Sequence, residues 1–148
     1  MIKKYKLGFN VWGLLLFLII MLPNFYWFAV PAPNDVLRAE STTGTIDTIA
    51  SIAQVLMIIA LCIIVNKDSK KIMMSPLIIA TIISCFLYFM GWIFYYQGVT
   101  NAVVILTLCV FPCLAFLFFA IDRKNRVAII PILIFTVCHL IYGVINFV

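Results

Sequence analysis

The chain has 148 residues, of which 66% are hydrophobic and 10% charged, and its formal net charge is +5. Its mean hydropathy is +1.23, whereas soluble domains are about 45–50% apolar and about 25% charged. This composition excludes a soluble globular fold, because so short a chain cannot remove that much apolar surface from water, and it indicates a single transmembrane domain over residues 1–148.

The first apolar segment covers about residues 7–30 and follows a cluster of three lysines. It is too long for the apolar part of a signal peptide. If residues 30–32 were a cleavage site, Pro33 would directly follow the cleaved bond, where signal peptidases do not accept proline. We therefore expect an uncleaved transmembrane helix, kinked at Pro23, because proline removes a backbone hydrogen bond and clashes with the preceding turn.

Residues 31–45 form the longest polar stretch and are expected to be an extracellular loop. Pro31 and Pro33 end the first helix, and several serine and threonine residues before position 46 offer N-caps for the second. The second helix is expected over about residues 46–65.

Three further apolar segments follow, at about 76–96, 102–121 and 127–148, and short polar loops separate them. Each segment has the roughly 20 residues that a helix needs to cross a bilayer. In lipid the backbone must satisfy its own hydrogen bonds, which favours helices. The sequence therefore predicts an all-α, polytopic bundle of five transmembrane helices.

The distribution of basic residues predicts the orientation of this bundle. With the N-terminus inside and the C-terminus outside, the inner side carries nine basic residues and the outer side only Arg38, as the positive-inside rule requires. The nine residues are Lys3, Lys4, Lys6, Lys67, Lys70, Lys71, Arg123, Lys124 and Arg126. They form three short clusters and no continuous patch, which argues against nucleic-acid binding. We expect a multi-pass protein of the plasma membrane, and the Ile- and Lys-rich composition favours a bacterial source.

Small and polar residues indicate which helix faces point inward. The clearest set recurs at helical spacing in segment 76–96 and consists of Thr81, Ser84, Cys85, Tyr88, Gly91, Trp92 and Tyr95. Segment 46–65 has a similar face with Asp47 and Gln54, and segment 127–148 has one with His139, Tyr142 and Asn146. Such faces are typical of helix packing in membranes, but ionisable groups inside the bilayer often mark a functional site.

His139 and Gln54 are expected at the same depth. His139 is roughly 18 Å above the inner end of its helix, and Gln54 is roughly 12 Å below the outer end of its own, at 1.5 Å per residue. One interpretation is a hydrogen bond between the two helices. The other is a ligand site in a cleft open to the exterior, with Asp35, Arg38 and Glu40 in the loop above it.

On the second interpretation, the cleft has a polar floor and an aromatic rim. Such a site suits a small amphiphile, a lipid-like molecule or a small organic cation. The predicted ligand-binding residues are Asp47, Gln54, Tyr88, Trp92, Tyr95, His139, Tyr142 and Asn146.

The residues for enzymatic chemistry are lacking. The sequence has one histidine, no HExxH or GxSxG motif and no acidic pair within an apolar segment, so we expect no enzyme. The five cysteines lie inside apolar segments without CxxC spacing and are interpreted as small core residues. We expect no metal and no cofactor.

Two kinds of function remain. The first is binding or transport of a small amphiphilic or lipid-like ligand in the outward cleft. The second is a non-enzymatic partner, regulatory or immunity-type subunit whose helix faces pack only against one another. A cavity bordered by Gln54, His139 and Trp92 favours the first, and a filled interior favours the second. Contact with membrane lipids and assembly into homo- or hetero-oligomers are compatible with both.

Overall fold

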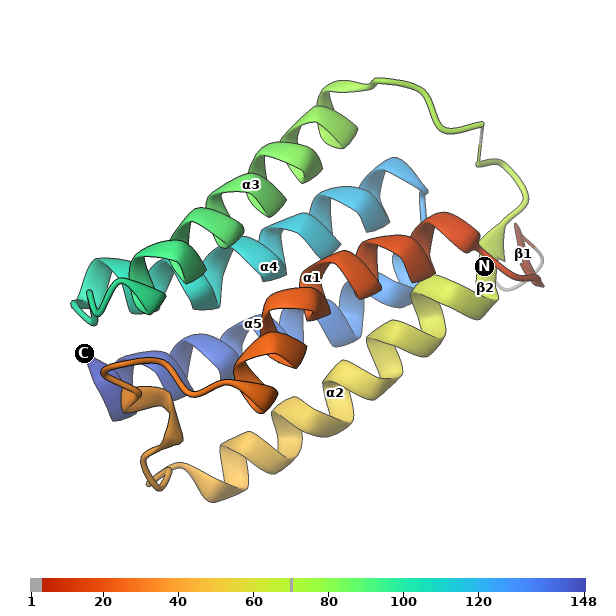
Figure 1. Cartoon of the computed structure of the whole chain (residues 1–148). Helices are drawn as coiled ribbons and strands as arrows, with labels where there is room; N and C mark the ends of the chain where they lie inside the picture. The colour runs from red at the N-terminus through yellow and green to blue at the C-terminus, as the bar shows by residue number, and fades with distance from the viewer. Residues whose placement is uncertain (1–3, 70) are drawn as a thin grey trace.

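The computed structural model describes residues 4–69 and 71–148, so that Lys3 and Lys70 of the predicted basic clusters lie outside the described residues. Five described helices are long and apolar enough to cross a membrane. They are α1 (Val11–Ala29), α2 (Gly44–Ile63), α3 (Pro76–Tyr96), α4 (Ala102–Asp122) and α5 (Arg126–Phe147) (Figure 1). The prediction of an all-α bundle with five such helices is confirmed.

Four of the helices form a curved row in the order α3, α4, α5 and α2, and α1 packs against one side of this row (Figure 1). Small residues allow the close approach of neighbours. A methyl group on Gly91 of α3 would lie 2.8 Å from Cγ2 of Thr107 of α4, and one on Gly143 of α5 would lie 2.7 Å from Sγ of Cys109. Because α1 contacts α2, α3 and α4 but is itself mostly exposed, it covers the row without being enclosed by it.

At one end of the bundle, other segments satisfy the last carbonyl groups of α2. The last carbonyls of a helix lack partners within the helix; that of Ala60 also accepts from the N–H of the C-cap residue Ile64. Asn125 donates to the carbonyl oxygen of Ala60 (2.8 Å), and Asn10 donates through its side chain to that of Leu61 (3.2 Å). The oxygens of residues 62 and 63 accept from the backbone N–H groups of residues 10 and 8. The start of α1 and the start of α5 are therefore bonded to the end of α2.

A short antiparallel pair of strands extends this junction. β1 (Tyr5–Leu7) pairs with β2 (Ile64–Asn66). The sequence analysis had assigned residues 7–10 and 64–65 to helices, which is wrong. The side chain of Asn10 accepts from the N–H of Gly13 and caps α1 there, so the helix begins at Val11.

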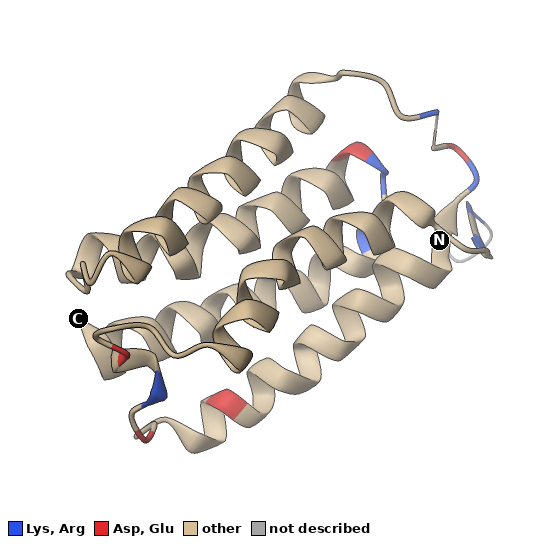
Figure 2. Cartoon of the chain, viewed as in Figure 1, with Lys and Arg blue, Asp and Glu red and all other residues tan. Residues whose placement is uncertain are grey.

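Basic residues gather at this end, which we call the basic end; its described basic members are Lys4, Lys6, Lys67, Lys71, Arg123, Lys124 and Arg126 (Figure 2). Asp68 and Asp122 lie there as well, in ion pairs with Lys4 and Arg123 (both 3.6 Å). The opposite end, which we call the loop end, holds the C-terminus and the connection between α1 and α2 (Figure 1).

The connection at the loop end, residues 30–43, is called the strap. It contains the 3-10 helix η2 (Val36–Arg38). Asp35 fastens its first half to α1 and α3, because its carboxylate accepts from Nε1 of Trp27 (2.8 Å) and the hydroxyl of Tyr95 (2.9 Å). Asn146 of α5 fastens the second half, accepting from the N–H of Thr42 (2.8 Å). The strap is thereby held over the end of the bundle.

Candidate functional site

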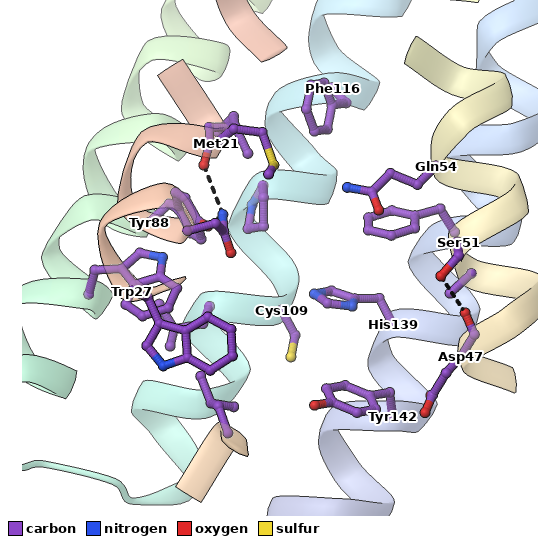
Figure 3. Close-up of a pocket in the computed structure, with 18 of the residues that line it drawn as sticks. Met21, Trp27, Asp47, Ser51, Gln54, Tyr88, Cys109, Phe116, His139 and Tyr142 are labelled. Carbon is purple, nitrogen blue, oxygen red and sulfur yellow. Dashed lines mark hydrogen bonds between the residues drawn. The ribbon is translucent and has the colours of Figure 1, made fainter. Parts of the chain in front are cut away.

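A cavity of about 460 Å³ lies between α1 and the row of the other four helices, beneath the strap (Figure 3). All five helices and the strap contribute to its wall. It reaches the surface, since Phe28, Ser41 and Ser51 line it and are exposed. Its volume falls in the range of sites for small molecules, about 300–1,000 Å³.

Six of the eight residues predicted to bind ligand line this one cavity, namely Asp47, Gln54, Tyr88, Trp92, His139 and Tyr142. The other two lie outside it. Tyr95 is fully buried and bonds the strap through Asp35 and the N–H of Leu37. Asn146 bonds the strap through Thr42 and Thr43. In this structure, Tyr95 and Asn146 therefore hold the strap that covers the cavity.

The wall formed by α2 carries a carboxylate, a hydroxyl and an amide. Oδ1 of Asp47 accepts from the hydroxyl of Thr43 (2.9 Å), and Ser51 donates to the backbone oxygen of Asp47 (2.9 Å). Gln54 lies about two turns further from the loop end, and its side chain makes no hydrogen bond with the described residues (Figure 3). The spacing of seven residues places all three on one face of α2.

The wall formed by α5 is a column of three rings. The imidazole of His139 stacks on Phe135 at 4.9 Å between ring centroids and on Tyr142 at 6.0 Å. The described residues include no hydrogen bond between His139 and Gln54, so the predicted contact is absent here; both side chains instead line the cavity (Figure 3). The polar atoms of His139 and Gln54 have no hydrogen-bond partner among the described residues and are available to a ligand.

The opposite wall, from α1 and α3, is aromatic. The rings of Trp27 and Trp92 have centroids 6.3 Å apart, and Tyr88 is 6.4 Å from Trp92. Asn24 of α1 donates to the hydroxyl of Tyr88 (2.7 Å) and joins the two helices. Trp92 presents its ring rather than its N–H, since Nε1 is buried and has no hydrogen-bond partner among the described residues.

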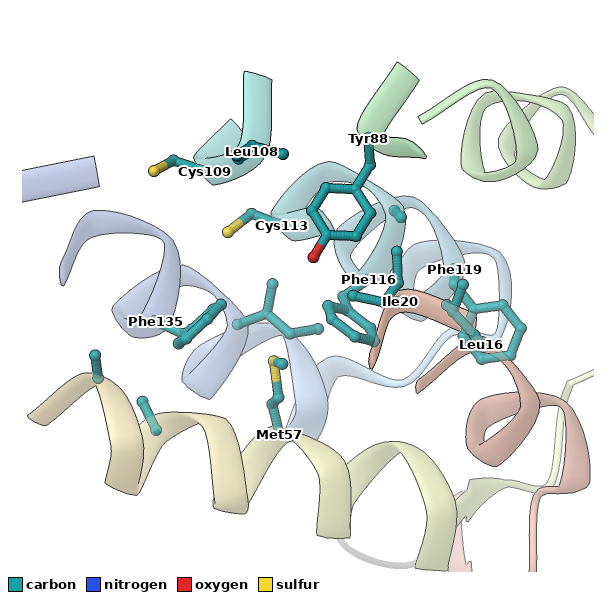
Figure 4. Packing of buried hydrophobic residues seen from close by; sticks show 14 of the residues in the cluster. Leu16, Ile20, Met57, Tyr88, Leu108, Cys109, Cys113, Phe116, Phe119 and Phe135 are labelled. Carbon is teal, nitrogen blue, oxygen red and sulfur yellow. The ribbon is translucent and has the colours of Figure 1, made fainter. Parts of the chain in front are cut away.

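The part of the cavity nearest the basic end is apolar. Phe17, Ile20, Pro112, Phe116 and Phe135 line it. Beyond them lies the packed hydrophobic core, in which Met57 and Ile132 are fully buried; Figure 4 shows Phe116, Phe135 and Ile20 next to the labelled Met57. The cavity thus changes from polar and aromatic near the strap to largely apolar at its deep end, where the amide of Gln54 is the polar group among these side chains.

The carboxylate of Asp35 accepts several hydrogen bonds within and next to the strap. Burial raises the pKa of its carboxyl, but hydrogen bonds from Trp27, Tyr95, the N–H of Ala32 and Arg38 outweigh this effect, so the pKa lies below its ordinary value of 3.8. Arg38 donates from Nε to Oδ2 of Asp35 (2.8 Å), and its guanidinium lies 4.9 Å from the ring centroid of Trp27. The carboxylate is therefore ionised and engaged within the strap.

Asn24, which lines the cavity, is not among the eight residues predicted to bind ligand. The apolar floor gave no signal, because its phenylalanines resemble those that face lipid. In the described part of the chain, no group of three or more His, Cys, Asp or Glu residues could hold a metal. The five cysteines are free, and four of them are buried.

Comparison with family models, curated proteins and solved structures gave no match. The site is therefore argued from its own geometry and chemistry.

Proposed function

We propose that this protein is a multi-pass membrane protein of the plasma membrane whose basic end faces the cytoplasm and whose strap faces the exterior. The basic end carries basic residues from the N-terminal segment and two loops, whereas the strap carries Arg38; such asymmetry sets topology. Fusion of a reporter active only outside the cell to the C-terminus should give signal, and a reporter active only in the cytoplasm should not. The opposite result excludes this orientation.

We propose further that the protein binds or transports a small amphiphilic or lipid-like molecule in the cavity beneath the strap. The observation that supports this most is the cavity itself, which is bordered by Gln54, His139 and Trp92. A polar group in a membrane segment normally finds a partner in a neighbouring helix. Here the amide of Gln54 and the imidazole of His139 have no such partner among the described residues and line open space instead.

The alternative is a partner, regulatory or immunity-type subunit with a filled interior. A bundle that served only packing has no need for a volume of about 460 Å³ that is lined by many polar and aromatic side chains. The cavity thus favours ligand binding over this alternative.

The test is thermal stabilisation of the purified full chain by a panel of amphiphiles and lipids. A ligand stabilises the folded state in proportion to RT ln(1 + [L]/Kd), so binding raises the melting temperature. The variant His139→Ala should lose most of the rise caused by any compound that stabilises the wild type.

The matched control is Thr136→Ala. It removes a polar group from the same helix, but Thr136 does not line the cavity, and its hydroxyl donates within α5 to the oxygen of Ile132. The control should respond like the wild type. If no compound stabilises the wild type, or if both variants respond equally, ligand binding at this cavity is excluded.

A further inference from the structure

We infer that the ligand of this cavity is an amphiphile with a positively charged head group, which lies beside Asp47 near the strap while its apolar tail points toward the basic end. The inference deepens the proposed function and rests on it. It follows from the charge of the lining, from the aromatic rings and from the gradient of polarity along the cavity.

Among the described residues that line the cavity, Asp47 is the only acidic one, and none is a lysine or an arginine. Among the described residues, its carboxylate accepts a single side-chain hydrogen bond, from Thr43, and no ion pair involves it. At mildly alkaline pH a histidine is neutral, so the lining then carries one uncompensated negative charge. A carboxylate at the edge of an apolar site attracts a cation more strongly than it would in water.

The nearest part of the strap does not supply the missing positive charge. Arg38 donates to Asp35 and to the backbone oxygen of Trp27, so its guanidinium is directed toward the first half of the strap. It is not among the residues that line the cavity. The two carboxylates therefore differ, because Asp35 forms an ion pair with Arg38 and Asp47 forms none with the described residues.

The aromatic residues near the strap suit a cationic head group. The faces of tryptophan and tyrosine rings attract cations, and the cavity is lined by Trp27, Trp92 and Tyr142. The structure already contains one such contact, between the guanidinium of Arg38 and the ring of Trp27 at 4.9 Å. The carboxylate and the rings together should bind a cationic head group more tightly than a neutral or an anionic one.

The length of the cavity fits a short hydrocarbon tail. Phe135 lies seven residues before Tyr142 on α5, which corresponds to roughly 10 Å along the helix axis. Over this distance the wall changes from Asp47 and Tyr142 to mostly apolar side chains, Phe116, Phe135 and Pro112, with the uncharged amide of Gln54 at the same level. A tail placed along this gradient leaves the charged head at the strap.

The test compares ligands with the same decyl tail and different heads, added to the full chain in nanodiscs of zwitterionic lipid at mildly alkaline pH. The probes are decyltrimethylammonium, the nearly isosteric but uncharged decyldimethylamine oxide, and decyl sulfate. Binding is followed by the fluorescence of the tryptophans, two of which line the cavity, and empty nanodiscs correct for partition into lipid.

We expect the cation to bind at least about tenfold more tightly than the amine oxide, a ratio equal to about 1.4 kcal/mol. Asp47→Asn should abolish this preference and leave the affinity for the amine oxide unchanged, which also shows that the variant is folded. Glu40→Gln is the matched control, because it removes an exposed negative charge of the strap that does not line the cavity; it should keep the preference.

Equal binding of the cation and the amine oxide, tighter binding of decyl sulfate, or an unchanged preference in Asp47→Asn would each overturn the cationic head group while leaving a ligand site in place. If no probe binds the wild type, this inference and the proposed function both fail.

Discussion

The two ends of the bundle are held together in different ways. At the basic end, the helices meet through backbone groups, because Asn10, Asn125 and the residues before α1 donate to the last carbonyls of α2. At the loop end, side chains bond to one another around Asp35, and a cavity of about 460 Å³ lies beneath them. A smaller pocket, of about 80 Å³, lies at the basic end.

The difference shows how a small bundle can be stable and still contain an open site. α1 and α2 are in backbone contact at Gly13, where a methyl group would lie 2.5 Å from the carbonyl oxygen of Leu61. Toward the strap the two helices are separated by the cavity, which both of them line. The closest packing of α1 on α2 is thus at the basic end, away from the cavity, whose polar groups are left without a packing role.

The largest effect is expected from Gly13→Ala. The added methyl group overlaps the backbone of α2, and such overpacking destabilises by about 1–3 kcal/mol. The measurement is the free energy of unfolding of the purified protein in a mixed-micelle titration. Gly44→Ala is the matched control, since nothing lies within 4 Å of its added methyl group; its stability should be unchanged or slightly higher. Equal effects of the two changes would show that the ends do not differ.

An intermediate effect is expected from Asp35→Asn, because the uncharged amide weakens the bonds from Trp27, Tyr95 and Arg38. Hydrogen bonds to charged groups contribute about 1.5–3 kcal/mol when buried; Arg38 is exposed, so we expect a loss of about 1–2 kcal/mol. Glu40→Gln, at an exposed position of the same strap, should change little.

The difference in stability between the wild type and Asp35→Asn should depend on pH, because the pKa of Asp35 is lowered in the folded protein. Its contribution to stability is complete above the pKa of the unfolded chain, about 3.9, and disappears as the pH falls through the lower pKa of the folded protein. The wild type and Asp35→Asn should therefore unfold at converging temperatures in acid. A difference that is the same at neutral and acidic pH contradicts the role given to the carboxylate.

The smallest effect on stability is expected from Gln54→Leu. The amide makes no hydrogen bond with the described residues, so its loss should change the free energy of unfolding by less than about 0.5 kcal/mol, while binding of a stabilising amphiphile is weakened. Gln97→Leu, at an exposed amide after α3, controls for added hydrophobicity. A loss of stability as large as that of Gly13→Ala would mean that Gln54 is part of the packing.

The sequence predicted the helices well, and the inward face of α3 best. Six of the seven residues assigned to that face are buried, and Cys85 is half-buried. The prediction succeeds because the helical period clearly separates this face of small and polar residues from the apolar face opposite. The start of α1 was placed too early, since residues 7–9 are no less compatible with a helix than those that follow. Only the cap at Asn10 and the pairing with β2 exclude them.

The helical spacing of polar residues also predicted part of the candidate site. Polar residues at helical spacing indicated Asp47, Gln54 and His139, which line the cavity. The roles of Asp35 and Asn125 depend on partners far away in the sequence, at Tyr95 and at Ala60, and no local pattern encodes them. The volume of the cavity is what packing leaves unfilled, and it follows from all five helices together.

The junction between α2 and α5 bears on the biosynthesis of the protein. The second helix leaves the ribosome with Asp47 and Gln54 on its inward face and with a terminal carbonyl at Ala60 that later accepts from Asn125. The helix that meets this face, α5, is made after α2, α3 and α4. Until then, a polar surface of α2 lacks its helical neighbour, which is unfavourable in a bilayer. A nascent chain interrupted after α4 therefore leaves this face uncovered, and the addition of α5 turns it into one wall of the cavity.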